Sequence, residues 1–240
     1  MKIKNKDIRV GFELESIVLR ERDVCNQFRD NDIDVDYHSD GSLNVYSRDE
    51  EWLEGYAISM EFVTEPLIYK SIKFENYFKV VSSLFSEHKL TINRTCGLHF
   101  HLSIGQDKLI IPLYLGEKKF VNRYKEWIKV NYPLVASKRL GVDYARDYRY
   151  KIVRTINITR YLFVNFTSLQ RHGTLEFRVY GYLNNPETTF KMYRDFVVDS
   201  IEFVKGYLAN IDARKQRTVD SSEVIEELND KVKRYQYCIN

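Results

Sequence analysis

The chain has 240 residues, of which 44% are hydrophobic and 14% aromatic, and its 37 basic side chains nearly balance 34 acidic ones. This aromatic content supplies the buried area that offsets chain entropy, so the composition excludes an intrinsically disordered protein. The net charge is only +3, and bases and acids are mixed along the chain. That pattern argues against a dedicated nucleic-acid binder, which gathers its basic residues in a stripe.

The first half of the chain predicts strands around one helix. Residues 73–88 carry apolar side chains at helical spacing. Three segments alternate apolar and polar residues, which is typical of half-buried strands. These segments are 8–19, 58–65 and 97–104. Between the first two, the polar segment 30–42 ends in Asp40-Gly41-Ser42, which is a turn signal.

The second half adds further strands and helices. A helix is expected over 118–130, and strands over 161–169 and 174–182. The stretch 138–151 is rich in Arg, Tyr, Asp and Lys and predicts a loop over the site or a short helix. Asn185-Pro186-Glu187 then offers a cap, a first-turn proline and an acid for a long helix. This mixture predicts an α+β protein in which helices cover one face of an antiparallel sheet.

The N-terminal residues and the cysteines indicate in which cellular compartment the protein is expected. Residues 1–7 are charged and lack the apolar stretch of a secretory signal, and no run of about 18 apolar residues predicts a membrane span. The three cysteines show no CxxC spacing, so neither a disulfide framework nor a cysteine-based zinc site is indicated. We therefore expect a cytoplasmic protein that binds no membrane.

Four predicted strands carry possible cation ligands on the face opposite their apolar residues. Glu13 and Glu15 are two residues apart, so both side chains point the same way, about 7 Å apart along a strand. The other positions are Glu61 on the second strand, His99 and His101 on the third, and Glu176 with Arg178 on the last. Each pattern alone is typical of a solvated sheet face. If the strands share one sheet, however, the carboxylates converge and would repel one another without cations between them.

The type of ligand predicts the type of metal. Carboxylates and imidazole without a thiolate suit Mg²⁺ or Mn²⁺ better than structural zinc. Such ions bridge phosphate oxygens during phosphoryl transfer, and Arg178 would neutralise the charge that develops on the transferred group. The chain contains no GxxxxGK[ST], GxGxxG, GxSxG or HExxH motif, so these nucleotide-binding and hydrolytic templates are excluded.

Six segments fall in an order that resembles the amidoligase family, which is similar to the glutamine synthetase and γ-glutamyl-cysteine ligase superfamily of carboxylate–amine ligases. They are Gly11–Glu15, Asp40-Gly41-Ser42, Glu61–Leu67, Cys96–His101, Arg160-Tyr161 with Asn165, and Gly173–Arg178. The resemblance covers about residues 8–183, and its most specific motifs are CGLHFH and TLEFR.

The resemblance implies an antiparallel sheet that forms a concave active-site trough, with helices packed on its other face as in the glutamine synthetase catalytic domain. It places this catalytic domain at residues 1–210 and leaves 211–240 as a C-terminal helical extension. It further implies an enzyme that joins a carboxylate substrate to an amine substrate through an acyl phosphate, with ATP and Mg²⁺ or Mn²⁺ and without nucleic acid.

The resemblance also assigns roles to residues. The expected metal ligands are Glu13, Glu15, Glu61, His99 and Glu176. Ser103, Arg178 and Arg160 are expected to contact ATP or the acyl phosphate, and Glu176 and Arg178 to be catalytic. Asp40, Ser42 and Asn165 are expected to lie near the substrate. His101 is either a partner of a metal ligand or a hydrogen-bonded structural imidazole.

Two alternative functions remain open. One is a metal-dependent hydrolase in which His99, His101 and carboxylates activate water, and the other is a non-catalytic binding protein on the same scaffold. Only the ligase would consume ATP in dependence on an amine acceptor. The sequence identifies neither the two substrates, nor the general base, nor the oligomeric state.

Overall fold

The computed structural model describes residues 3–105, 117–140, 162–166, 168 and 173–218. After a short 3₁₀ helix at Asn5–Asp7, the strands are β1 (Ile8–Val18), β2 (Val35–Ser39), β3 (Ile58–Thr64), β4 (Leu67–Ile68), β5 (Leu90–Thr91), β6 (Leu98–Ile104), β7 (Val164–Asn165) and β8 (Leu175–Phe177). The helices are α1 (Glu21–Arg29), α2 (Ser47–Leu53), α3 (Ile72–Ser86), α5 (Glu117–Asn131), α6 (Pro133–Arg139) and α9 (Pro186–Thr218).

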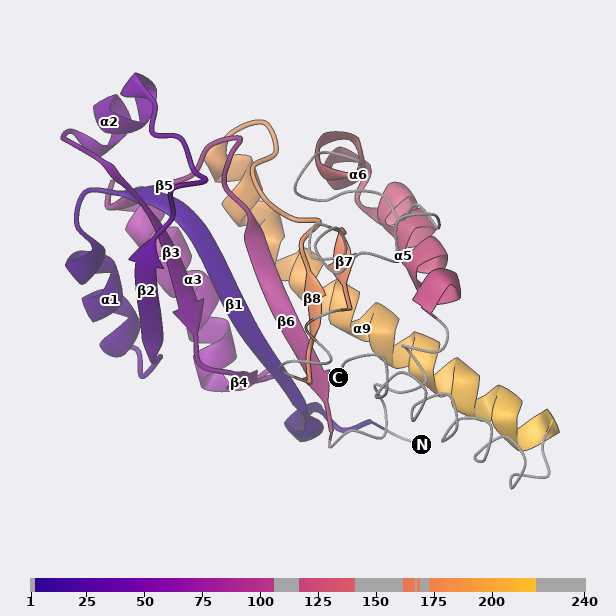
Figure 1. Ribbon diagram of the computed structural model, residues 1–240. Coiled ribbons are helices and arrows are strands. Elements are labelled where there is room, and N and C mark those ends of the chain that lie inside the picture. The colour runs from indigo at the N-terminus through magenta and orange to yellow at the C-terminus, as the bar shows by residue number, and fades with distance from the viewer. Residues whose placement is uncertain (1–2, 106–116, 141–161, 167, 169–172, 219–240) are drawn as a thin grey trace, which may run out of the picture.

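The strands form one sheet with β1 at its centre (Figure 1). Over the described residues the order is β2-β3-β1-β6-β8-β7, and the short β4 and β5 pair with the two ends of β1. Every pairing between these strands is antiparallel. The predicted α+β class with an antiparallel sheet is therefore confirmed.

Helices α3 and α9 cover one face of the sheet (Figure 1). The alternation of β1 turns Phe12 toward them, and its ring stacks on Tyr77 of α3 at a centroid distance of 3.8 Å and meets Tyr193 of α9 at 6.3 Å. Aromatic pairs of this kind contribute about 0.5–1.5 kcal/mol beyond the area they bury. The Tyr193 hydroxyl also donates to the backbone carbonyl of His99 at 3.4 Å. These aromatic side chains, Phe12, Tyr77 and Tyr193, form an aromatic layer that packs against β1 and β6 on the helical side of the sheet.

A side chain caps the start of both helices, and the cap of α9 is the one that the sequence predicts. The Ser71 hydroxyl accepts a hydrogen bond from the amide of Phe74 at the start of α3. The Asn185 side chain accepts one from the amide of Thr188 at 2.8 Å, and Pro186 is the first residue of α9. Such caps satisfy amides that have no partner within the helix.

Several elements differ from the expectations. The polar segment 30–42 contains strand β2, and α1 and α2 occupy segments for which no element was predicted. The strands expected over 161–169 and 174–182 are short in the described residues, where they are β7 and β8. Helix α6 overlaps the start of the stretch 138–151, whose residues 141–151 lie outside the described part.

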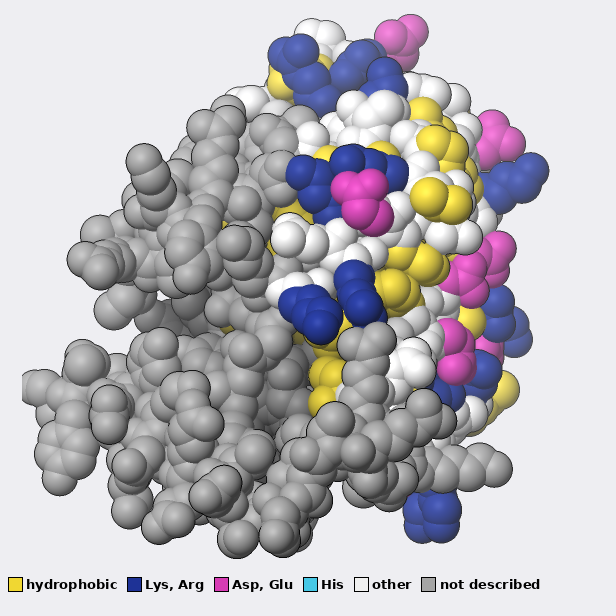
Figure 2. All heavy atoms as spheres, turned by 90° about the vertical axis from the view of Figure 1, so that its right-hand side faces the viewer, with side chains coloured by type: hydrophobic (Ala, Val, Ile, Leu, Met, Phe, Trp, Pro, Cys, Tyr) yellow, Lys and Arg dark blue, Asp and Glu magenta, His cyan; other side chains and the backbone are white. Residues whose placement is uncertain are grey.

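Helix α9 continues to Thr218. Residues 219–240, which hold most of the expected C-terminal extension, lie outside the described residues, so the division at 210 stays a prediction. Within the described part of the chain, no helix is both long enough and apolar enough to cross a bilayer. On the face seen in Figure 2, the described Lys and Arg side chains alternate with hydrophobic and acidic ones.

Candidate active site

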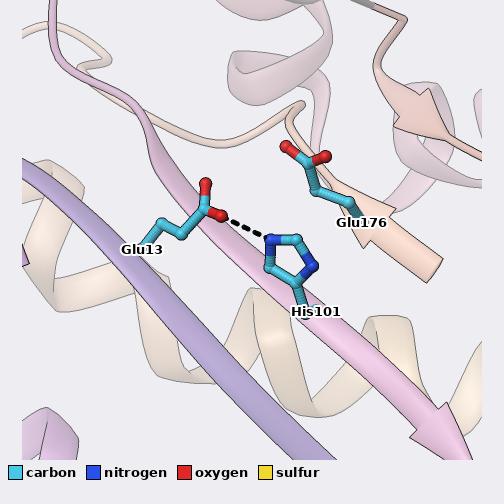
Figure 3. A group of neighbouring side chains, drawn as sticks. All are labelled: Glu13, His101 and Glu176. Atoms are coloured by element: carbon cyan, nitrogen blue, oxygen red, sulfur yellow. Dashed lines mark hydrogen bonds and ion pairs between the residues drawn. The ribbon is translucent and has the colours of Figure 1, made fainter. Parts of the chain in front are cut away.

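The strand register brings the expected ligands of β1, β6 and β8 onto one face of the sheet. Glu13 lies opposite His99, and His101 lies opposite Glu176. Directly opposed residues of antiparallel strands point to the same side. Because neighbouring Phe12 points into the helical layer, these side chains stand on the opposite face, away from α9 (Figure 3). Their convergence was the main expectation from the sequence.

Glu13, His101 and Glu176 form the tightest group. One ligand atom from each of the three lies within 4.8 Å of the others (Figure 3). His101 Nε2 is 2.6 Å from Glu13 Oε1, and its Nδ1 is 3.1 Å from the Thr174 hydroxyl, which orients the ring. Two carboxylates and an oriented imidazole at this spacing fit a divalent cation. His101 is thus part of the candidate site itself, whereas His99 is not in this group of three.

Neighbouring charges and burial shift the pKa values of His101 and Glu13 in opposite directions. Burial lowers the pKa of His101. The hydrogen bond and the charge of Glu13 raise this pKa by more than burial lowers it, so the pKa lies above the ordinary 6.5. Burial likewise raises the pKa of Glu13, yet the hydrogen bonds from His101 and His99 bring it well below its ordinary value. In the metal-free pair, the Glu13 carboxylate and the His101 imidazolium therefore stabilise each other.

His99 of β6 connects this group to Glu15 of β1. Its Nδ1 is 3.3 Å from Glu13 Oε2 and 3.7 Å from Glu15 Oε1. The side chain is 1% exposed, and its Nε2 has no hydrogen-bond partner among the described residues. The amide of Gly97 donates to Glu15 Oε2 at 2.5 Å. A Cβ atom on Gly97 would lie 2.1 Å from His99 Nε2, so only glycine leaves room for this imidazole.

Glu176 is the most buried carboxylate of the group, with 4% exposure. It accepts hydrogen bonds from Asn165 Nδ2 at 2.6 Å, from the Ser168 hydroxyl at 3.1 Å and from the Arg178 guanidinium. These donors fix the orientation of the carboxylate. Asn165, expected near the substrate, thus contacts an expected metal ligand, and Arg178 lies beside the group as the E-x-R spacing predicted.

Glu61 joins the site from β3, opposite Glu15. Burial raises its pKa, and the neighbouring charges of Glu13 and Glu15 raise it further. His38 of β2 partly offsets this effect, with its Nε2 2.6 Å from Glu61 Oε2. His38 could not be singled out from the sequence, because β2 is mostly exposed and has no apolar face that marks it as a strand.

The other expected residues lie outside this group. Ser103 occupies β6 opposite Arg9, on the same face as His101. Asp40 follows β2, and its carboxylate accepts from the amide of Ser42 at 2.8 Å. Within the described residues no hydrogen bond or ion pair joins the side chain of Asp40 or Ser42 to the carboxylates of the site. Arg160 lies outside the described residues.

One arginine near the site was not singled out from the sequence. Arg139, at the end of α6, is 4% exposed, and a Cβ atom on Gly181 would lie 2.7 Å from its Cζ. Burial lowers the pKa of its guanidinium, and the charge of Glu15 opposes that change. A single arginine in a basic stretch carries no sequence signal for such burial.

The chain matches no protein-family model, no curated protein and no solved structure. The function proposed below therefore rests on the chain's own residues.

Binding of Mg²⁺ or Mn²⁺ is expected to strengthen with rising pH. The pKa of His101 is raised above 6.5, so its proton is still present in the metal-free protein as the pH passes 6.5 and must leave before the imidazole can bind a cation. Affinity should rise by up to about tenfold per pH unit below the folded-state pKa. The same proton stabilises the metal-free fold at low pH, and this stabilisation is lost as the pH rises through that pKa.

Titration calorimetry in two buffers of different ionisation enthalpy would measure the proton released per ion bound. In His101→Gln the release should disappear. A wild-type affinity that is independent of pH would contradict a role for this imidazole as a ligand.

Proposed function

We propose that this protein is a carboxylate–amine ligase that depends on ATP and on Mg²⁺ or Mn²⁺, and that it is related to the amidoligases. The observation that carries the proposal is the grouping of Glu13, His101 and Glu176 within 4.8 Å on one sheet face, with Arg178 bonded to Glu176. An isolated acidic strand would not need a half-buried arginine and two imidazoles beside it.

The donor set fits a hard divalent cation. Glu13, His101 and Glu176 would hold one ion, and His99, Glu15 and Glu61 lie next to them on the same face. Carboxylate oxygens and imidazole nitrogen suit Mg²⁺ or Mn²⁺. When bound, such an ion withdraws charge from the phosphoryl oxygens of a nucleotide.

The chain's own residues would then act on the two chemical steps. In the first, a carboxylate oxygen of the substrate attacks the γ-phosphorus of ATP, the bond to the ADP oxygen breaks, and an acyl phosphate forms. Arg178 would stabilise the charge on the transferred phosphoryl group, and Glu176 fixes its guanidinium. In the second step the amine attacks the acyl carbon, inorganic phosphate leaves with the electron pair of the C–O bond, and the proton lost by the amine is taken up by the released phosphate.

We further propose that the sheet corresponds to the active-site trough of the glutamine synthetase superfamily. Its support is the antiparallel set β3-β1-β6-β8 with polar ligands on one face and the helices α3 and α9 on the other. A solved structure with nucleotide bound across β1 and β6 would test this correspondence.

The decisive experiment is mass spectrometry of reactions that contain the protein, ATP, Mg²⁺ and pooled amino acids and amines. The ligase should yield a product one water lighter than the sum of two reactants, together with ADP and phosphate. ATP consumption that persists without any amine and gives no such product would favour the hydrolase. Metal binding without consumption of ATP would favour a non-catalytic binding protein.

Arg178→Ala is expected to lower kcat about 10²–10³-fold, the usual loss when one donor to a developing charge is removed. The dissociation constant of ATP should change much less, because the charge that Arg178 stabilises develops during the transfer. Arg22→Ala, on the exposed side of α1, is the matched control. Single-turnover phosphoryl transfer and equilibrium ATP binding would be measured together, and a defect confined to binding would contradict the assigned role.

A further inference from the structure

Two glycines mark one end of the site face. Gly97 and Gly181 face each other in an isolated antiparallel bridge just before β6 and after β8. Opposed positions of this kind point to the same side of the sheet. A Cβ atom on Gly97 would meet His99 Nε2 at 2.1 Å, and one on Gly181 would meet the Cζ and Nη2 atoms of Arg139 at 2.7 Å. The Arg139 guanidinium therefore lies on the same face as His99.

This guanidinium is buried, and the described residues provide no counter-ion for it. Arg139 is 4% exposed, and its Nε has no hydrogen-bond partner among the residues that the structure describes. In the described part of the chain no carboxylate comes within ion-pair distance of it. The charge of Glu15 raises the pKa of Arg139, but Glu15 Oε2 already accepts a hydrogen bond from the amide of Gly97 at 2.5 Å. A buried charge that is not paired destabilises the fold, so its presence calls for an anion that the described residues do not supply.

Arg178 stands on the same side. Its positive charge lowers the pKa of the Arg139 guanidinium, as expected for two neighbouring cations. The Nε of Arg178 also lacks a hydrogen-bond partner within the described residues, although another of its nitrogens bonds Glu176. Two neighbouring guanidinium groups with free donors are the usual recognition elements for phosphate and carboxylate oxygens.

We propose that Arg139 and Arg178 form an oxyanion-binding subsite at the Gly97–Gly181 end of the sheet face. This subsite takes a phosphate or carboxylate group and does so without a metal ion. Only the identity of the natural anion rests on the proposed function, where it would be a phosphate of ATP or the carboxylate of a substrate. The subsite itself rests on Arg139, a residue outside the motifs that suggested the ligase.

The test uses the full-length protein in EDTA with inorganic phosphate as the probe, followed by thermal unfolding and titration calorimetry. Phosphate should raise the Tm of the wild type by binding the folded state. Arg139→Met should have a higher Tm than wild type without phosphate, because a buried unpaired charge is gone. It should also bind phosphate at least about tenfold more weakly, the loss expected for a charge-assisted hydrogen bond. Arg22→Met, at an exposed position, should match wild type in both respects.

A lower Tm for Arg139→Met with an unchanged phosphate response would overturn the proposal, since the guanidinium would then be structural. Arg139→Lys keeps the charge but not the paired planar donors, and it should bind phosphate several-fold more weakly while folding normally. Equal affinity in this variant would also count against the subsite.

Competition identifies the natural anion. Tripolyphosphate that displaces phosphate more strongly than glutarate would assign the subsite to a nucleotide, and the reverse order would assign it to a carboxylate substrate. Either order supports an oxyanion subsite, and no phosphate binding by the wild type would end the proposal. Because no turnover is measured, a failure of the ligase assignment would leave these results intact and can be told apart from a failure of the subsite.

Discussion

Glu13→Gln is expected to abolish metal-dependent ATP turnover. Glu13 is the carboxylate that contacts both imidazoles, with one oxygen 2.6 Å from His101 and the other 3.3 Å from His99. The amide keeps the shape of the side chain but removes the charge that a divalent cation requires. Loss of several kcal/mol of charge stabilisation corresponds to a fall in kcat of about a thousandfold or more.

The variant should still fold, and a second measurement separates loss of the site from loss of the fold. Glu13 is what raises the pKa of His101, so in Glu13→Gln this pKa should fall, which an NMR titration of the imidazole would detect. Glu126→Gln, on an exposed surface of α5, is the matched control and should retain full turnover. Unchanged turnover and Mn²⁺ affinity in Glu13→Gln would remove the metal assignment.

Gly97→Ala is expected to have the largest effect of any single methyl group added to the site. The new Cβ would lie 2.1 Å from His99 Nε2 and 2.9 Å from Glu15 Oε2, closer than nonbonded atoms approach. The His99 ring is buried, so it has little free space into which to move. Overpacking of this kind costs about 1–3 kcal/mol of unfolding free energy, and we expect a value near the upper end. Affinity for Mn²⁺ should fall as well, because His99 and Glu15 are displaced.

Gly206→Ala provides the comparison. Gly206 lies in α9 on an exposed surface, and a Cβ atom there meets nothing within 4 Å. Alanine in a helix interior is favoured over glycine by about 1 kcal/mol, so this variant should be more stable than wild type. Urea unfolding should give changes in unfolding free energy of opposite sign for the two variants. If Gly97→Ala were as stable as wild type, the close approach of His99 to the backbone would be contradicted.

The central part of the fold could be predicted because its strands have one apolar and one polar face. In β1, Val10, Phe12 and Leu14 are fully buried at every second position, and this alternation is visible in the sequence. Strand β2 gave no such signal, since four of its five residues are exposed. Strands β7 and β8 are two and three residues long, and both faces of each are buried, so their limits could not be read from a period-2 pattern.

Some residues of the site could likewise be predicted from the sequence, and others could not. Glu13, Glu61 and Glu176 were found because each occupies the polar face of a strand, and the register of the sheet then brings them together. The hydrogen bond of His101 to Glu13 depends on that register, which the sequence does not specify. Arg139 lies 35 residues after the end of β6 and 36 residues before the start of β8, so only tertiary packing places it over Gly181.

Strand β2 forms one edge of the described sheet and pairs only with β3. An edge strand with exposed side chains opens at a lower free energy than the core, so the amides of β2 should exchange with deuterium well before those of β1. His38 moves with this strand, and each opening separates it from Glu61 and returns that carboxylate to water. The hydration of one side of the site can thus vary on the timescale of local fluctuation, while the aromatic layer behind β1 and β6 keeps Glu13 and His101 in place.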